Sequence, residues 1–123
     1  MALPADLEAI VRRLNRDNAR AAARLTENQR DAYTAACQLA ERMGAADPTL
    51  RRVVLFGSTL PGRRYRKDSD IDLAVEGGDR AFMERIVAEA TRPVDIIGLD
   101  ELRPGIRESV LTEGLVLYDA ELK

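Results

Sequence analysis

The feature that most constrains this chain is a pair of aspartates, Asp70 and Asp72, at the start of an apolar run that ends at Val75. Successive side chains of a strand point to opposite faces, so both carboxylates share one face and Ile71 lies on the other. Two neighbouring carboxylates repel each other unless a cation lies between them. A hard divalent ion with oxygen ligands, Mg²⁺ above all, suits such a pair. The sequence therefore predicts a metal site at the start of a strand.

A second feature precedes this pair: the apolar run Val53–Phe56 ends in Gly57 and Ser58. The run predicts a strand, and the turn after it offers backbone N–H groups and a hydroxyl to phosphate oxygens. Basic residues gather around the turn and form either a solvated loop or one that attracts polyphosphate: Arg51, Arg52, Arg63, Arg64, Arg66 and Lys67. A phosphate cradle beside metal-binding carboxylates indicates nucleotide chemistry.

The composition narrows the classes of protein that fit. The chain has 123 residues, with 19 basic against 21 acidic and a net charge of −2, which argues against nucleic-acid or membrane binding driven by bulk charge. It has no histidine and one cysteine, Cys37, so His-based triads, an internal disulfide and a thiolate metal cage are excluded. Acid–base chemistry then falls to carboxylates, Lys or Tyr. Because no apolar run approaches a membrane span and the N-terminus lacks a signal-peptide core, we expect a cytoplasmic protein.

The first part of the chain, residues 1–46, predicts a helical extension. Apolar residues recur at helical spacing over residues 4–24, and Thr26 with Gln29 forms a capping box that opens a second helix. This helix is expected to run to about Met43, with Gly44 as its C-cap. A single long helix across Thr26 is the competing interpretation. The apolar stripe either packs on the domain's own sheet or forms a homo-oligomer or partner interface.

The second part, residues 47–123, alternates predicted strands and helices. This alternation is typical of a small α/β domain with helices packed on a sheet, and the two parts are expected to form one structural unit. The expected strands cover residues 53–56, 70–75, 94–99 and 115–118, and the expected helices cover residues 80–90 and 104–112.

A third carboxylate, Asp95, lies within the apolar strand over residues 94–99. A carboxylate inside such a strand is costly unless it is paired or bound to a metal, although a strand-edge aspartate that faces water is the alternative. With Asp70 and Asp72 it gives three carboxylates on adjacent strands. Phosphoryl or nucleotidyl transfer with two Mg²⁺ ions needs such a set, and the third acid can also take the proton of the attacking hydroxyl.

Three motifs in combination, over residues 55–58, 68–73 and 94–96, resemble the minimal nucleotidyltransferase family of the DNA polymerase beta superfamily. The resemblance covers residues 51–118. It implies a small mixed sheet with flanking helices, and it implies that Gly57 and Ser58 hold the phosphates of a nucleoside triphosphate. It also implies that Asp70 and Asp72 ligate both metals and that Asp95 completes the site, with Mg²⁺ and ATP as ligands.

The loop after Ser58 departs from the family pattern. Members commonly carry an arginine four residues after the glycine, where this chain has Pro61, and the interval to Asp70 is one residue longer than usual. Arg63 or Arg64 could supply the missing charge to the phosphates from this longer loop.

Many proteins of this family resemble antitoxins encoded beside a HEPN-type RNase toxin, and some transfer AMP from ATP to the toxin. The resemblance thus implies an adenylyltransferase antitoxin with a HEPN-type partner. Two alternatives remain: a non-catalytic module that masks its partner through the N-terminal helices, or a nucleotidyltransferase that acts on a small molecule or an RNA end. The acidic balance and the scarcity of aromatic residues disfavour RNA.

Overall fold

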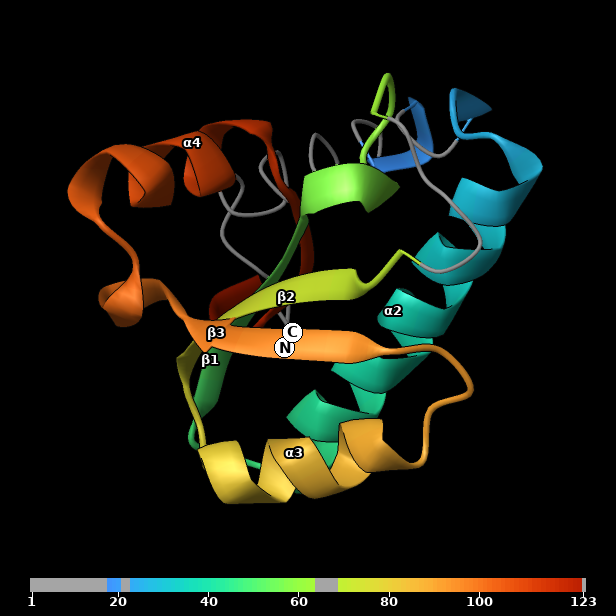
Figure 1. The fold of residues 1–123 in the computed structure, drawn as a ribbon. Coiled ribbons are helices and arrows are strands. Elements are labelled where there is room, and N and C mark those ends of the chain that lie inside the picture. Colours follow the sequence, from blue (N-terminus) through green and yellow to red (C-terminus); the bar gives the residue numbers. More distant parts are fainter. Residues whose placement is uncertain (1–17, 21–22, 64–68, 123) are drawn as a thin grey trace.

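A four-stranded mixed sheet forms the centre of the molecule (Figure 1). The computed structural model describes residues 18–20, 23–63 and 69–122. The strands are β1 (Leu50–Phe56), β2 (Ile71–Gly77), β3 (Val94–Gly98) and β4 (Leu115–Asp119), in the spatial order β3-β2-β1-β4. β1 pairs antiparallel with β2 and β4, and β2 pairs parallel with β3. The expected α/β class and mixed sheet are confirmed.

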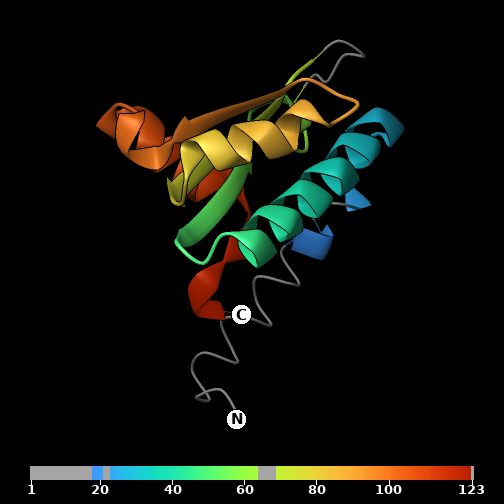
Figure 2. The same ribbon diagram turned by 90° about the horizontal axis from the view of Figure 1, so that it is seen from below.

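Helices cover both faces of this sheet. The α-helices that the structure describes from end to end are α2 (Glu27–Ala46), α3 (Arg80–Ala88) and α4 (Pro104–Glu113). α2 and α3 lie on one face and α4 lies on the other (Figure 2). Single 3₁₀ turns follow three of the strands: η1 (Gly57–Thr59), η2 (Leu99–Glu101) and η3 (Ala120–Leu122). Within the described residues, every helix is too short or too polar to cross a lipid bilayer.

The two faces of the sheet bury separate apolar clusters because strand side chains alternate between the faces. Val53 and Leu55 of β1 join the larger cluster under α2 and α3, whereas Val54 joins the smaller one under α4. The helical members of the larger cluster come from both helices: Ala32, Ala36, Leu39, Ala40, Met43, Met83, Ile86 and Val87. α2 is therefore part of the same core as the sheet, and the division of the chain at residue 46 stays a prediction.

The start of α2 follows the sequence expectation. Thr26 is the N-cap, its hydroxyl accepts from the Gln29 N–H at 3.2 Å, and the Gln29 side chain accepts from the Thr26 N–H at 3.0 Å. Residues 24–26 lie outside any helix, so the break is present and a single long helix is wrong. Most of the helix expected over residues 4–24 lies outside the described residues.

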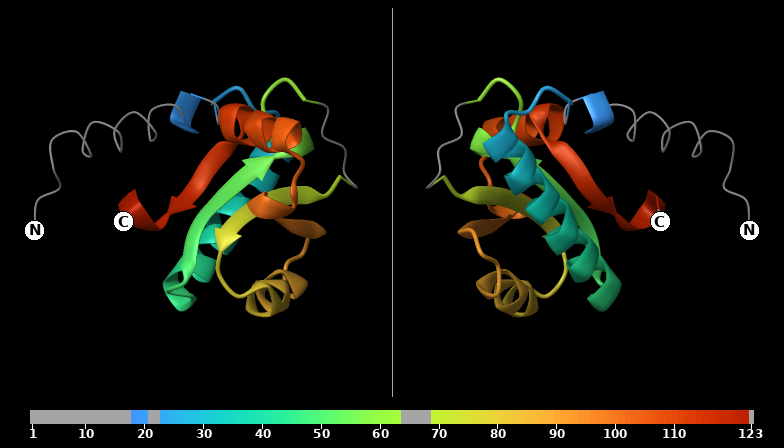
Figure 3. Two further views of the ribbon diagram at one scale, coloured as in Figure 1. Left: turned by 90° about the vertical axis from the view of Figure 1, so that its left-hand side faces the viewer. Right: turned by 90° about the vertical axis from the view of Figure 1, so that its right-hand side faces the viewer.

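The end of α2 differs from the expectation. The helix continues through Gly44 to Ala46, and its C-cap is Asp47. α2 packs against β4, and both elements can be followed in the side views of Figure 3. Gly44 is buried against the ring of Tyr118 in β4, and a Cβ at this position would overlap that ring. The glycine therefore permits a close approach between α2 and β4 rather than a left-handed cap.

Candidate active site

Gly57 places the turn after β1 directly on a carboxylate of β2. Its φ of +80° lies in the left-handed region, which favours glycine. A Cβ on Gly57 would overlap Oδ2 of Asp72, and the preceding residue, Phe56, is the register partner of Asp72. The turn that contains Ser58 is thus an immediate neighbour of Asp72, one of the metal-binding candidates.

Asp70, Asp72 and Asp95 come together at the adjoining strands β2 and β3. Asp72 and Asp95 are register partners, and Asp70 precedes Asp72 by two residues. Ile71 and Leu73 are buried in the cluster under α2 and α3, so the alternating Asp72 faces the side of α4. Burial, followed by the charges of Asp95 and Asp70, raises the pKa of Asp72 to about 6. The carboxylates are therefore close enough to repel one another.

Asp95 differs from its expected environment. It is exposed because β3 is an edge strand of the sheet, so the high cost of a buried carboxylate does not arise. A side-chain hydrogen bond with Asp70 raises the pKa of Asp95, and partial desolvation and the charges of Asp70 and Glu84 raise it further. Asp95 thus faces water and also adjoins the other two acids, and its place in a metal site stays a prediction.

Of the two arginines proposed to hold the phosphates, the structure describes Arg63. The guanidinium of Arg63 is ion-paired with Glu113 of α4 at 2.6 Å, and both side chains are about half exposed. Arg64 lies outside the described residues. A phosphate at the turn would compete with Glu113 for Arg63, so the role assigned to this arginine stays a prediction.

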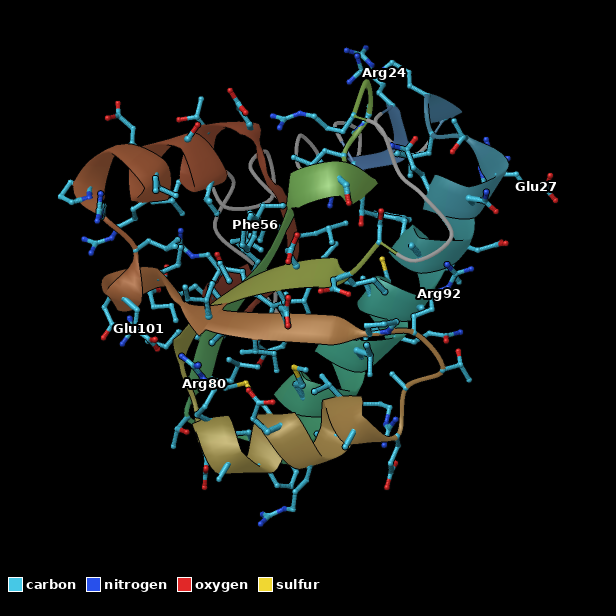
Figure 4. The ribbon with its side chains drawn as sticks, in the orientation of Figure 1. Arg24, Glu27, Phe56, Arg80, Arg92 and Glu101 are labelled. Atoms are coloured by element: carbon cyan, nitrogen blue, oxygen red, sulfur yellow. The ribbon has the colours of Figure 1, made fainter. Side chains whose placement is uncertain are left out.

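A cleft of about 280 Å³ opens between η1 and α4 beside Gly57. Figure 4 shows Phe56 between these two elements. The apolar part of the lining includes Phe56, Leu60 and Ile106, and the ion pair of Arg63 and Glu113 supplies charge. The cleft adjoins the carboxylates through Gly57, so a nucleotide at the turn has space on the side of α4.

Residues 41–122 match the family model described as polymerase beta, nucleotidyltransferase. The chain belongs to this family. The match covers the whole sheet and the last turns of α2, and it confirms the family expected from the motifs. No curated protein matches the chain.

Two solved toxin–antitoxin structures share this nucleotidyltransferase fold. One is a mutant of MntA–HpeT, which replaces two aspartates at alternate positions with glutamate. It is 25% identical to this chain, covers 67% of it and 68% of the matched chain, and has a TM-score of 0.51. The other is a toxin–antitoxin structure with AMP-PNP, which is 24% identical, covers 72% and 77% of the two chains, and has a TM-score of 0.50.

The chemistry of the acids in this nucleotidyltransferase fits a hard divalent ion. The three neighbours offer carboxylate oxygens alone, which are the ligands that Mg²⁺ prefers. A cation among them would also offset the burial and the repulsion that together raise the pKa of Asp72. Among the described residues, no group of three or more His, Cys, Asp or Glu side chains is arranged to hold a metal ion, and Asp70 and Asp95 are hydrogen-bonded to each other. The acids are thus neighbours rather than a closed cage.

Gln29 contacts the turn in a way that the sequence interpretation missed. Its side chain is 1% exposed, and Nε2 donates to the backbone carbonyls of Ser58, Leu60 and Arg63 at 3.1, 2.9 and 2.9 Å. The signal in the sequence was its position: Gln29 stands on the inward stripe of α2, three residues before Ala32. A buried amide on an apolar stripe needs polar partners, and the loop after Gly57 supplies them.

Thr59 is the other residue that was missed. It is fully buried in η1, and its hydroxyl has no hydrogen-bond partner within the part of the chain that the structure describes. An unpaired buried hydroxyl costs folding free energy, and nothing in the sequence around Gly57 and Ser58 indicates it.

Proposed function

We propose that this protein transfers AMP from ATP, with Mg²⁺, to a protein partner, a HEPN-type RNase toxin, and thereby acts as its antitoxin. One observation carries the proposal: the left-handed Gly57 lies against the Asp72 carboxylate, with Asp70 and Asp95 beside it. The proposal assigns phosphate binding to this turn and metal binding to these acids, and nucleotidyl transfer requires the two functions side by side.

Each acid has a role in that reaction. The acceptor hydroxyl oxygen attacks the α-phosphorus, the bond from this phosphorus to the oxygen that bridges to the β-phosphate breaks, and pyrophosphate leaves. Asp70 and Asp72 would hold Mg²⁺, which neutralises charge on the phosphates when it is bound. The exposed Asp95, with its raised pKa, accepts the proton of the hydroxyl.

The family and the fold support the proposed partner. The MntA–HpeT mutant that resembles this chain is a toxin–antitoxin complex, and its two replaced aspartates have the same spacing as Asp70 and Asp72.

The test uses ATP labelled at the α-phosphate, Mg²⁺ and the protein encoded next to this one. We expect label on the neighbour with the wild-type protein and with Asp100→Ala, an exposed aspartate in η2 outside the acid set. The double variant Asp70→Ala/Asp72→Ala should transfer none. If the wild type transfers no label, or if the double variant transfers as much label as the wild type, the proposal is wrong.

A binding-only antitoxin is the second candidate. It is favoured by the ion pair with Glu113, which engages an arginine proposed to contact the phosphates, Arg63, and by the open arrangement of the acids within the described residues. Toxin neutralisation separates the two candidates. If Asp70→Ala/Asp72→Ala neutralises the toxin at the same dose as the wild type, binding rather than transfer is the function.

A further inference from the structure

The Gln29 side chain joins the start of α2 to three peptide groups of the loop after Gly57. One NH₂ group donates to three carbonyls, and the amide oxygen accepts from the Thr26 N–H. The loop is otherwise closed by its own backbone bonds, from Leu60 N–H to Gly57 O and from Arg63 N–H to Leu60 O, both at 3.2 Å. Gln29 therefore contacts the backbone along the whole loop from Ser58 to Arg63.

The direction of these carbonyls fixes the direction of the amide that follows. In a trans peptide the C=O and the next N–H point to opposite sides. When the Ser58 carbonyl points inward to Gln29, the Thr59 N–H points away from Gln29. Because Thr59 is fully buried and Pro61, after Leu60, has no N–H, the contacts with Gln29 chiefly fix the side on which the carbonyl oxygens lie. Carbonyl oxygens repel phosphate, whereas N–H groups attract it, so a loop that binds phosphate must keep its carbonyls on the far side.

We propose that Gln29 is a positioning residue for nucleotide binding: it holds the Ser58, Leu60 and Arg63 carbonyls away from the phosphates, so that the turn at Gly57 and Ser58 does not direct carbonyl oxygens toward them. The inference rests on the proposed nucleotide site at Gly57 and Ser58 and does not depend on which acceptor receives the nucleotide. It gives α2 a function in the site beyond its place in the core.

Two substitutions remove the NH₂ donor of the Gln29 side chain in different ways. Gln29→Met keeps the length of the side chain without polar atoms, and Gln29→Glu keeps the oxygen that accepts from Thr26 but places a carboxylate among three carbonyls. The Kd for ATP with Mg²⁺ is measured for each below its melting temperature. We expect affinity to fall by about tenfold or more. In the transfer assay the KM for ATP should rise more than kcat falls, because the acids are unchanged.

Two controls separate positioning from stability. Thr26→Ala removes the hydroxyl that accepts from the Gln29 N–H but leaves the three carbonyl contacts, so it should lower the melting temperature without changing the Kd. Gln38→Glu makes the same chemical change at an exposed position of the same helix and should change neither. Equal loss of affinity in Thr26→Ala and Gln29→Met would overturn the proposal, as would wild-type affinity in both Gln29 variants.

A measurement on the wild type covers the case in which the variants fail to fold. The backbone amide NMR signal of Ser58, which is partly exposed, should shift when ATP and Mg²⁺ are added, and no shift at saturating nucleotide would overturn the inference. If the wild type binds ATP through this loop but labels no protein, the proposed function fails while the role of Gln29 stands.

Discussion

At the scale of single residues, Asp72 lowers the stability of the folded protein at neutral pH. Its ordinary pKa of 3.8 rises to about 6 in the folded protein, so the folded state holds this proton more tightly than the unfolded state. The associated stability is fully present below the unfolded pKa and is lost as pH rises through the folded pKa. At neutral pH the ionised carboxylate therefore costs folding free energy, which a bound cation would recover.

Asp72→Asn should accordingly stabilise the metal-free protein at pH 8. We expect a gain of about 1 kcal/mol, or several degrees in melting temperature, with a smaller gain at pH 5, where Asp72 is largely protonated. Thermal melts at both pH values without Mg²⁺ measure this. Added Mg²⁺ should raise the melting temperature of the wild type but not of the variant. An equal gain in stability at both pH values would contradict the raised pKa of Asp72.

Gly57→Ala should destabilise the protein and stop nucleotide transfer. The alanine Cβ would meet the Asp72 carboxylate at a backbone conformation that is already strained for an L-residue. We expect a loss of about 1–3 kcal/mol in the free energy of unfolding, measured by urea titration. Gly62→Ala is the matched control, because Gly62 also has a positive φ of 77° but has open space around it. Equal losses would mean that backbone strain alone matters.

At the scale of elements, the contact between α2 and β4 depends on Gly44. Alanine normally stabilises the interior of a helix relative to glycine by about 1 kcal/mol. Here the added Cβ would displace the Tyr118 ring, so we expect Gly44→Ala to lower the free energy of unfolding by about 1–3 kcal/mol. Gly105→Ala in α4, which has open space around it, should be neutral or stabilising. A stabilised Gly44→Ala variant would show that the ring moves without cost.

The elements that the sequence predicted are those whose signals are local. The capping box at Thr26, the alternation around Asp70 and Asp72 and the Gly-Ser turn each depend on residues a few positions apart. Contacts between distant residues left no such signal: Gly44 resembled a C-cap because Tyr118 is 74 positions away along the sequence (118 minus 44). The bonds from Gln29 to the turn and the ion pair of Arg63 with Glu113 escaped prediction for the same reason.

At the scale of the whole molecule, α2 and the sheet form one body. The inward stripe of α2 packs in the core with β1 and β2, so the helix is needed to bury their apolar side chains. A fragment of residues 47–123 should therefore be unfolded or aggregated, whereas a fragment of residues 23–123 should fold. Circular dichroism and urea titration of both fragments test this expectation. A cooperative unfolding transition in the shorter fragment would show that the predicted domain boundary at residue 46 is real.

β3 is an edge strand of the sheet, and this position affects the tendency of the protein to aggregate. An outermost strand presents backbone groups that another chain can pair with, and β3 would be an apolar segment but for Asp95, which interrupts Val94, Ile96 and Ile97. The same carboxylate proposed to accept a proton thus also discourages intermolecular strand pairing. Replacing it with an apolar residue would remove this protection, so an inactive variant intended to remain monomeric is better made with asparagine than with valine.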